Sequence, residues 1–252
     1  MTNMIALITG GSRGLGRNMA HHLAAKGTDI LFTYRERKDE ADGLIEELKL
    51  MGRKAVALPL DTGVSGSFPA FAAQVKDALK THWGRDNFDF LINNAGMALY
   101  APFAEVTEAQ FDGIINVHFK GVVFLTQALL PLIKDGGRIL NLSSGLARFS
   151  YPGSSIYGAT KAAIDALTRY MALELGPRRI TVNAIAPGAI ETDFGGGRVR
   201  DNADINAAIA KQTPLGRVGL PDDIGGAVAL LLSDEAGWIN GQRIEVSGGI
   251  HA

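Results

Sequence analysis

The sequence predicts an α/β fold in which a parallel β-sheet carries helices on both faces. Seven apolar strand patterns alternate with stretches of helical spacing along the 252 residues, which favours a doubly wound sheet with right-handed crossovers. The first pattern, Met4–Thr9, is continuously apolar, as expected of a strand that is buried on both faces. Because no repeat, linker or low-complexity segment divides the chain, we expect a single domain over residues 1–252.

Composition argues against several classes of function. The net charge of −1 gives no electrostatic basis for binding nucleic acid or an anionic membrane, and we expect neither partner. Without cysteine there is no disulfide and no thiolate nucleophile. We expect no metal site, because the histidines lack the spacing of metal ligands: His21, His22, His82, His118 and His251. Met1 leads directly into a strand pattern and no apolar run reaches ~18 residues, so the expected location is cytoplasmic.

A glycine-rich turn follows the first strand pattern and precedes a helical one. Gly10, Gly14 and Gly16 would let the backbone turn sharply and approach a ligand closely. The amino terminus of the following helix offers free N–H groups and the positive end of a dipole to a phosphate. The turn is therefore a candidate dinucleotide site, although glycine also ends strands for purely structural reasons.

The tip of the second strand pattern, Ile30–Tyr34, bears on the choice of dinucleotide. A carboxylate there would bind a ribose 2′-hydroxyl, but Tyr34 and Arg35 occupy the position. Arg35 and Arg13 of the glycine turn would instead bind a 2′-phosphate, which favours NADP(H) over NAD(H). Two alternatives stay open: the arginines only solvate a surface loop, or Glu36 turns inward and serves NADH.

The next elements continue the alternation. Helical patterns over residues 39–51 and Phe68–Trp83 flank a third strand pattern, Lys54–Asp61. Its last residue, Asp61, either accepts a hydrogen bond from an adenine amino group or starts a turn.

Amides stand in apolar surroundings in the middle of the chain. Asn93 and Asn94 lie in the fourth strand pattern, Phe88–Gly96, where amides are costly unless they are hydrogen-bonded. We expect them to bridge strands or to line the cofactor cleft. Asn116 interrupts the long apolar helical pattern Glu108–Ile133 and needs a partner, either a catalytic water or a structural hydrogen bond.

The stretch from Ser144 to Lys161 has the composition of an active site. Ser144 ends the fifth strand pattern, Gly137–Ser144, at the edge where open α/β sheets place their ligands, and its hydroxyl could hold a substrate oxygen. Tyr157 and Lys161 are four residues apart at the start of a helical pattern, so they share one face. A nearby ammonium stabilises a phenolate and brings the pKa of the phenol towards a value useful for proton transfer.

The last third of the chain contains one irregular segment. Ile180–Gly188 predicts the sixth strand and a turn, Pro221–Ser233 a helix and Gln242–Ser247 the seventh strand. Residues 189–217 between them lack a strand period and contain Gly195–Gly197, which predicts a mobile lid near the ligand.

These motifs occur in the order of a known family. The chain resembles the classical short-chain dehydrogenases/reductases over nearly its full length, which implies a single-domain Rossmann fold. Residues 9–16 resemble the family's cofactor turn, residues 93–96 its sheet-stabilising motif, and residues 187–192 the segment around the nicotinamide. The resemblance implies cofactor contacts at Gly10, Ser12, Arg13, Gly14, Leu15, Gly16, Tyr34, Arg35, Asp61, Asn93, Ala95, Gly96, Tyr157, Lys161, Pro187, Gly188, Ile190 and Thr192.

Asn116, Ser144, Tyr157 and Lys161 match the family's catalytic tetrad. The resemblance implies hydride transfer between a nicotinamide and a carbonyl or alcohol, with Tyr157 as general acid or base. Lys161 would lower the pKa of that tyrosine and hold the nicotinamide ribose, Ser144 would polarise the carbonyl, and Asn116 would anchor a water molecule.

The expected function is NADPH-dependent reduction of a small-molecule ketone, as in the 3-oxoacyl reductases that the chain resembles. An NAD(P)-dependent alcohol or sugar dehydrogenase is the alternative within the family, and a non-catalytic dinucleotide sensor is the alternative outside it, which the intact tetrad disfavours. Substrate specificity should lie in Met97–Pro102, Arg148–Gly153 and the lid. The resemblance also implies a homotetramer, with one interface formed by the apolar helices Glu108–Ile133 and Tyr157–Leu175.

Overall fold

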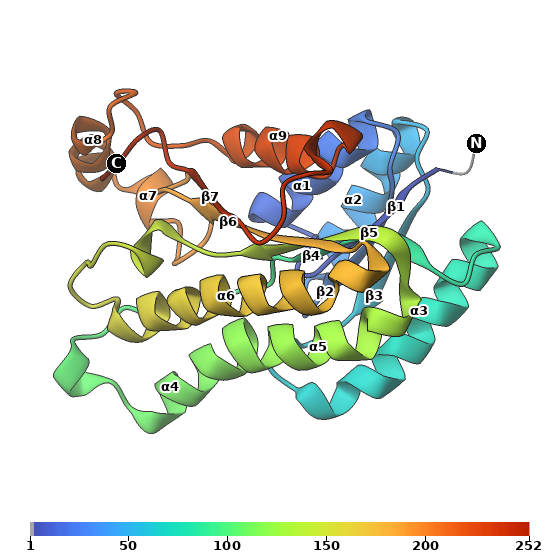
Figure 1. The fold of residues 1–252 in the computed structure, drawn as a ribbon. Helices are drawn as coiled ribbons and strands as arrows, with labels where there is room; N and C mark the ends of the chain where they lie inside the picture. Colours follow the sequence, from blue (N-terminus) through green and yellow to red (C-terminus); the bar gives the residue numbers. More distant parts are fainter. Residues whose placement is uncertain (1–2, 252) are drawn as a thin grey trace.

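A seven-stranded parallel sheet lies in the middle of the molecule, with helices on both faces (Figure 1). The computed structural model describes residues 3–251. The strand order is β3-β2-β1-β4-β5-β6-β7, so the chain moves outward in one direction from β1 and then in the other from β4. This confirms the predicted doubly wound sheet. The strands are β1 (Ile5–Ile8), β2 (Asp29–Tyr34), β3 (Ala55–Pro59), β4 (Phe88–Asn93), β5 (Ile133–Leu142), β6 (Thr181–Pro187) and β7 (Arg243–Val246).

The helices form two layers. One layer contains α1 (Gly14–Ala25), α2 (Lys38–Leu50) and α9 (Pro221–Leu231). The opposite layer contains α3 (Phe68–Trp83), α4 (Glu108–Ile115), α5 (Gly121–Leu129) and α6 (Ser155–Glu174) (Figure 1). Two short helices, α7 (Arg198–Asp201) and α8 (Ala203–Gln212), lie within the segment 189–217.

Burial on both faces explains the continuous apolar runs of the strands. Along β1, Ala6 and Ile8 belong to the core beneath α1, α2 and α9, whereas Ile5 and Leu7 belong to the core beneath α3, α5 and α6. All four side chains are fully buried. A fully buried leucine or isoleucine side chain contributes about 1.5–3 kcal/mol to stability, so both cores favour this strand.

The long helical pattern before β5 is less regular than the sequence predicts. A π-helical turn, Asn116–Lys120, separates α4 from α5, and a 3₁₀ turn ends at Leu132. The predicted extension of the helix to Ile133 and the predicted strand start at Gly137 are both wrong, because Ile133 already pairs with Phe88. The register shifts before Arg138, where residues 134–137 bulge out of the sheet, with Gly136 at a positive φ of 79°.

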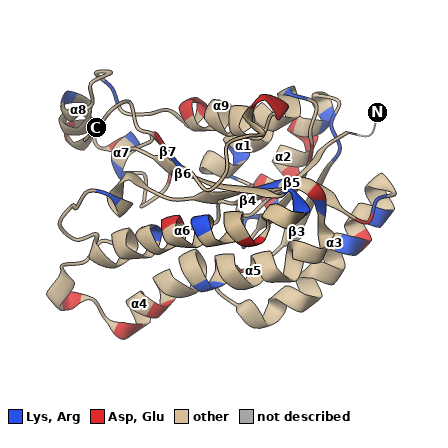
Figure 2. Ribbon diagram, viewed as in Figure 1, with Lys and Arg blue, Asp and Glu red and all other residues tan. Residues whose placement is uncertain are grey.

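The same stretch has an apolar outer face. Acidic and basic residues are mixed over the view in Figure 2, whereas α5 carries no charged residue. Residues 108–132 are long and apolar enough to pass a length-and-composition test for a membrane span, with a mean hydropathy of 1.4, and 33% of the tested window is buried. The core helix of a soluble protein passes the same test. Two large apolar side chains of this stretch, Phe111 and Phe124, are exposed and available to contact a further partner.

Candidate active site

The glycine turn lies between β1 and α1, next to the end of β4. Gly10 adopts a positive φ of 64°, and a Cβ there would come within 3.1 Å of the Ala95 Cα. The Asn94 side-chain amide donates hydrogen bonds to the carbonyl oxygens of Thr9 at 2.9 Å and Gly10 at 3.0 Å. Thr9 Oγ1 in turn accepts a hydrogen bond from the Ala95 backbone at 2.9 Å. The turn is thus fixed to β4, which confirms the expected bridging role of Asn94.

Asn93 bridges the sheet and the helix layer. Its side-chain amide donates to Asn141 Oδ1 at 2.9 Å and to Thr126 Oγ1 at 3.1 Å, so it joins β4, β5 and α5. Both N–H groups of the amide are thus satisfied inside the protein, which confirms that Asn93 bridges strands.

The amino terminus of α1 fits a phosphate group. In the described chain no side chain caps this terminus, and Arg13 occupies the N-cap position. The first-turn N–H groups, from Gly14 to Gly16, are therefore free to bind an anion. Ser12 is buried in the turn, and Leu15 packs partly against the core beneath α1.

Both arginines expected at a 2′-phosphate have carboxylate partners. Arg13 forms an ion pair of 2.6 Å with Asp193, and Arg35 one of 2.8 Å with Glu36. The arginine side chains are about three-fifths exposed, and exposed pairs of this kind are weak. Glu36 therefore contacts Arg35 rather than turning inward.

The other residues expected at the adenine lie at the ends of β2 and β3. Tyr34 is half-buried at the end of β2, and Asp61 is exposed just beyond β3. Asp61 Oδ1 accepts a hydrogen bond from the Gly63 backbone at 2.8 Å, so this residue does start a turn. Among the described residues its other carboxylate oxygen accepts no hydrogen bond, which leaves that oxygen for an adenine amino group.

Ser144, Tyr157 and Lys161 come together beyond the end of β5. Ser144 Oγ accepts a hydrogen bond from the Leu146 backbone at 3.2 Å, which fixes the turn that follows the strand. Lys161 Nζ donates to the Leu142 carbonyl at 2.6 Å and lies 5.6 Å from the centroid of the Tyr157 ring. A Cβ on Gly158 would come within 2.8 Å of the Leu146 carbonyl oxygen, so glycine lets α6 pack closely against this turn.

Burial dominates the electrostatics of this group. Burial raises the pKa of Tyr157 well above its ordinary value, and a hydrogen bond with Ser144 opposes the shift. The expected lowering of the Tyr157 pKa is therefore not found in the chain by itself, because burial penalises the phenolate more than its neighbours stabilise it. Burial also lowers the pKa of Lys161 to about 7, while the charge of Asp165 opposes that shift.

Asn116 opens the π-helical turn. Its backbone carbonyl accepts the hydrogen bond of the Gly121 N–H, five residues later, and its side chain is half-buried. Such wide turns within helices frequently occur at functional sites.

His118 is a contact that the sequence pattern does not predict, because the spacing of the histidines argues only against a metal site. It is 2% exposed, and its Nε2 lies 2.7 Å from the Met97 carbonyl oxygen and 2.9 Å from the Met97 nitrogen. Burial and the nearby charge of Lys161 lower its pKa to about 3, so the ring is neutral. A Cβ on Gly96 would come within 2.7 Å of the same ring. Its position two residues after Asn116 was the available signal, but helical periodicity cannot show the π-helical turn that directs it inward.

The segment after β6 approaches Tyr157. A Cβ on Gly188, which follows Pro187, would come within 2.9 Å of the Ser247 Cα, and Ile190 bridges to Gly219. Thr192 is buried, and its hydroxyl accepts a hydrogen bond from the Phe194 backbone at 3.2 Å.

Aromatic side chains from two segments lie near Tyr157. The Phe194 and Tyr157 ring centroids are 6.2 Å apart, and the Arg198 guanidinium lies 5.3 Å from the centroid of Tyr100. Tyr100 is 50% and Phe194 43% exposed, so both present apolar surface to whatever enters. The first part of residues 189–217 therefore lies beside the candidate catalytic group, as expected of a lid segment.

Comparisons with known proteins agree with this geometry. The family model described as enoyl-(acyl carrier protein) reductase matches residues 10–251. A tetrahydroxynaphthalene reductase of Pestalotiopsis fici is 38% identical over 256 residues, which cover 97% of this chain and 90% of that protein. The solved structure of a short-chain dehydrogenase/reductase from Serratia marcescens has a TM-score of 0.90 at 31% identity, covering 99% of this chain and 98% of that one. The chain belongs to the short-chain dehydrogenase/reductase family.

A further similar solved structure contains a bound cofactor. The angucycline C-6 ketoreductase LanV with bound NADP has a TM-score of 0.93 at 34% identity, and the match covers 98% of this chain and 95% of LanV. The present chain is accordingly an oxidoreductase that acts on carbonyl or alcohol groups, and it binds a nicotinamide nucleotide.

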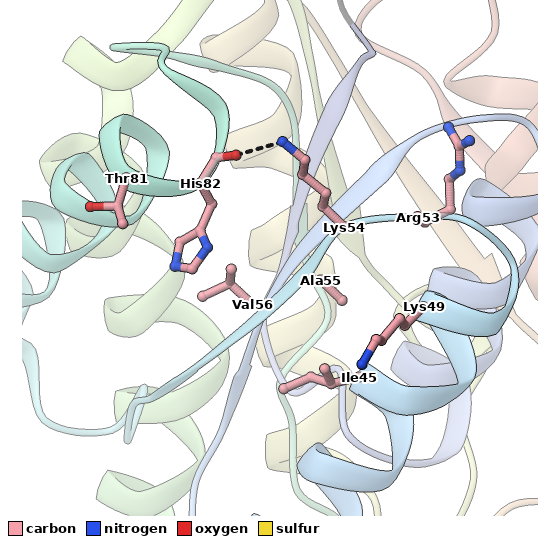
Figure 3. A pocket seen from close by; sticks show the side chains of 8 residues that line it. All are labelled: Ile45, Lys49, Arg53, Lys54, Ala55, Val56, Thr81 and His82. Carbon is pink, nitrogen blue, oxygen red and sulfur yellow. Dashed lines mark hydrogen bonds between the residues drawn. The ribbon is translucent and has the colours of Figure 1, made fainter.

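Two shallow cavities lie outside the Tyr157 site of this family member. One, of about 510 Å³, lies between the glycine turn and the lid segment and is lined by Arg13, Thr192 and Asp193 among others, so it adjoins the expected cofactor site. The other, of about 400 Å³, lies at the carboxyl ends of α2 and α3 (Figure 3). Two of its cations already donate to backbone carbonyls, Lys54 to that of His82 at 2.8 Å and Arg53 to that of Gly27 at 2.9 Å, and the third, Lys49, lies 3.7 Å from Glu46. Within residues 3–251 no group of three His, Cys, Asp or Glu side chains could hold a metal ion.

Proposed function

We propose that the chain is an NADPH-dependent reductase of ring-bearing ketones. The observation that carries the proposal is the position of Tyr157, which lies beside Ser144 and Lys161, with the Phe194 ring centroid 6.2 Å from its own. A proton donor, a hydrogen-bond donor and a cation thus share one partly enclosed site.

These residues have distinct roles in the reduction. Tyr157 transfers its phenolic proton to the substrate oxygen, and Ser144 donates a hydrogen bond to the same oxygen, which develops negative charge. The Lys161 ammonium stabilises the phenolate that remains. The nicotinamide nucleotide, when bound, supplies the hydride that reduces the carbonyl carbon. Asn116, at the wide helical turn, is assigned to a water molecule that returns a proton to Tyr157.

The cofactor site is assigned to the edge of the sheet where the strand order reverses. The diphosphate is held by the free N–H groups at the amino terminus of α1, because a helix dipole and unpaired donors favour an anion there. The 2′-phosphate is held by Arg13 and Arg35, whose exposed ion pairs with Asp193 and Glu36 are weak enough to exchange for charge-assisted bonds to phosphate.

The substrate class rests on the aromatic surroundings of Tyr157. Tyr100 and Phe194 offer faces on which a flat ring can stack, with centroid separations of roughly 4.5–7 Å in favourable aromatic pairs. Two relatives are named for reductions of polycyclic aromatic compounds, a hydroxynaphthalene and an angucycline, and these names support a ring-bearing ketone. A 3-oxoacyl thioester, expected from the sequence, is the competing substrate.

The test is NADPH oxidation by the purified chain with three ketones: a bicyclic aromatic ketone, a 3-oxoacyl thioester and a short aliphatic ketone. The expected order of kcat/KM places the bicyclic ketone first. Binding of NADPH without oxidation by any ketone would favour a sensor instead. A higher kcat/KM for the thioester would keep the reductase and reject the ring-bearing substrate.

A further inference from the structure

A half-buried arginine contacts the turn that carries Ser144. Arg243, on the edge strand β7, has a side chain that is 19% exposed. Its Nη2 donates to the Ser144 carbonyl at 2.9 Å, and its Nε lies 2.9 Å from Asp165 Oδ2. One guanidinium therefore connects the backbone of the serine to a carboxylate on α6, the helix that carries Tyr157 and Lys161.

Asp165 lies one helical turn after Lys161. The spacing of four residues places both side chains on the same face of α6, and both are buried, Asp165 with only 11% of its side chain exposed. Asp165 Oδ1 has no hydrogen-bond partner among the described residues. A carboxylate in such surroundings acts on a neighbouring cation more strongly than it would in water.

We propose that Asp165 and Arg243 form a positioning pair for the reduction: Arg243 fixes the Ser144 backbone, and Asp165 supplies the negative charge that keeps Lys161 an ammonium ion. This inference rests on the proposed function. Neither side chain contacts the substrate oxygen, so both act through Ser144 and Lys161.

The charges around Lys161 come from four elements. Tyr157 and Asp165 belong to α6, His118 to the π-helical turn and Arg243 to β7, while the Leu142 carbonyl of β5 accepts the hydrogen bond of Lys161. His118 is neutral because its pKa is about 3. Asp165 is thus the anion that offsets burial, which by itself favours the neutral amine.

The pair is part of a longer chain of charges. Glu245, also on β7, lies 3.3 Å from Arg243 Nη1 and 3.1 Å from Arg148 Nε. Arg148 follows the Ser144 turn, so Glu245 and Arg243 hold that turn from two sides. Burial raises the pKa of Asp165, and the charges of Arg243 and Arg169 oppose that shift.

The sign of the pH effect follows from these positions. The ammonium of Lys161 is present below its pKa of about 7 and is lost as the pH rises through that value. Without the Asp165 charge the pKa falls further, by ~1–3 units for a close charged neighbour, so the ammonium is lost at lower pH. The loss of ketone reduction as the pH rises should then begin at a lower pH as well.

The experiment compares Asp165→Asn, Arg243→Lys and the wild type in the full-length protein. Asp165→Asn should move the alkaline decline of kcat to lower pH by about one unit or more. Arg243→Lys keeps a cation beside Asp165 but loses the forked geometry, so kcat should fall up to ~10²-fold while the pH of the decline stays in place. The matched control is Asp234→Asn, since Arg138 also joins an aspartate, Asp234, to a backbone carbonyl, that of Ser233.

A second measurement does not need turnover. Proteins labelled with ¹³C at the lysine Cε are titrated by NMR, and Lys161→Met assigns the resonance. Asp165→Asn should lower the midpoint of this resonance; if that variant does not fold, Asp165→Ser replaces it. If the midpoint of the Lys161 resonance is unchanged in a folded Asp165 variant, or if that variant loses the same fraction of activity at every pH, Asp165 has only a structural role. If the wild type reduces none of the ketones but Asp165→Asn still lowers the midpoint of the Lys161 resonance, the proposed function is rejected and the electrostatic role of Asp165 is kept.

Discussion

His118 packs edge-on against Tyr157, with ring centroids 5.3 Å apart and ring planes at 87°. The histidine is anchored at Met97, beyond the end of β4, and therefore connects that strand end to the candidate general acid. Because the edge of one aromatic ring is positive and the face of another is negative, this geometry is attractive. The contact restricts the Tyr157 ring while leaving its hydroxyl free to react.

The buried histidine should make the fold sensitive to acid. Its folded pKa of about 3 is below the ordinary value of 6.5, so the unfolded state binds the proton more readily. The contribution of neutral His118 to the free energy of unfolding is complete above pH 6.5 and is lost as the pH falls from there towards 3. Urea unfolding between pH 7 and pH 4 should therefore show a shallower pH dependence in His118→Gln than in the wild type. The matched control is exposed His82→Gln; if both variants have the wild-type slope, His118 is not the group responsible.

Tyr157→Phe should abolish turnover and spare cofactor binding. The ring and its contacts with His118 and Phe194 remain, and only the transferable proton is lost. General acid–base catalysis typically contributes ~10²–10⁴-fold, so kcat should fall by that factor. NADPH fluorescence titration measures the affinity, which should stay within about threefold of the wild type, an energy difference of about 0.7 kcal/mol. Near wild-type ketone reduction by this variant would remove Tyr157 from the mechanism.

The cofactor preference should depend on Arg13 and Arg35. A 2′-phosphate that receives two charge-assisted contacts would gain roughly 1.5–3 kcal/mol from each in a well-formed site, less at these exposed positions. We expect kcat/KM to favour NADPH over NADH by about ten- to a hundredfold, which corresponds to about 1.4–2.7 kcal/mol.

Substitutions at the tip of β2 test this preference. Arg35→Ala and Tyr34→Asp should each reduce it, whereas Arg37→Ala, on a neighbouring arginine that already pairs with Asp39, should leave it unchanged. A wild-type preference for NADH would overturn the assignment. So would the same ratio of kcat/KM for NADPH to that for NADH in all three variants.

Residues 189–217 should exchange amide hydrogen quickly until ligands bind. Gly195, Gly196 and Gly197 all have positive φ angles between 62° and 75°, and each glycine is entropically costly to fix. Hydrogen exchange should slow in this segment when NADPH and substrate are added, with α3 as an internal reference that does not change. Strong protection without ligands would identify a rigid wall rather than a lid.

The chain should assemble as a homotetramer through its apolar outer helices. Large exposed side chains lie on α4, α5 and α6: Phe111, Phe124, Tyr170 and Leu173. Helices that are apolar on their outer faces need a partner beyond their own sheet. Sedimentation velocity should show a tetramer for the wild type and smaller species for Phe124→Asp, whereas Leu50→Asp, on the 88% exposed Leu50 of α2, should have no effect. A stable wild-type monomer at micromolar concentration would refute the assembly.

Features that depend on residues close together in the chain could be predicted from the sequence. Apolar runs buried on both faces gave the strands, and the i, i+4 spacing of Tyr157 and Lys161 placed both on one helix face beside Ser144. Charge pairing between distant segments could not be inferred in this way. Arg13 meets Asp193 only because β1 and β6 end at the same edge of the sheet, and Arg243 meets Asp165 only because β7 lies beside β6. The pKa of Tyr157 likewise depends on burial, which no spacing reveals.

The wide turn at Asn116–Lys120 separates the two halves of the apolar helix by one extra residue. Each residue of an α-helix turns the direction of a side chain by about 100°. Without a wide turn the extra residue would rotate α4 relative to α5 by this angle; the wide turn takes it up locally, and His118 reaches Tyr157 from within that turn. Removing one residue from the wide turn would restore ordinary helical hydrogen bonding between α4 and α5, whereas removing one residue from the regular part of either helix would rotate the side chains beyond the deletion by about 100° and turn them away from their present contacts.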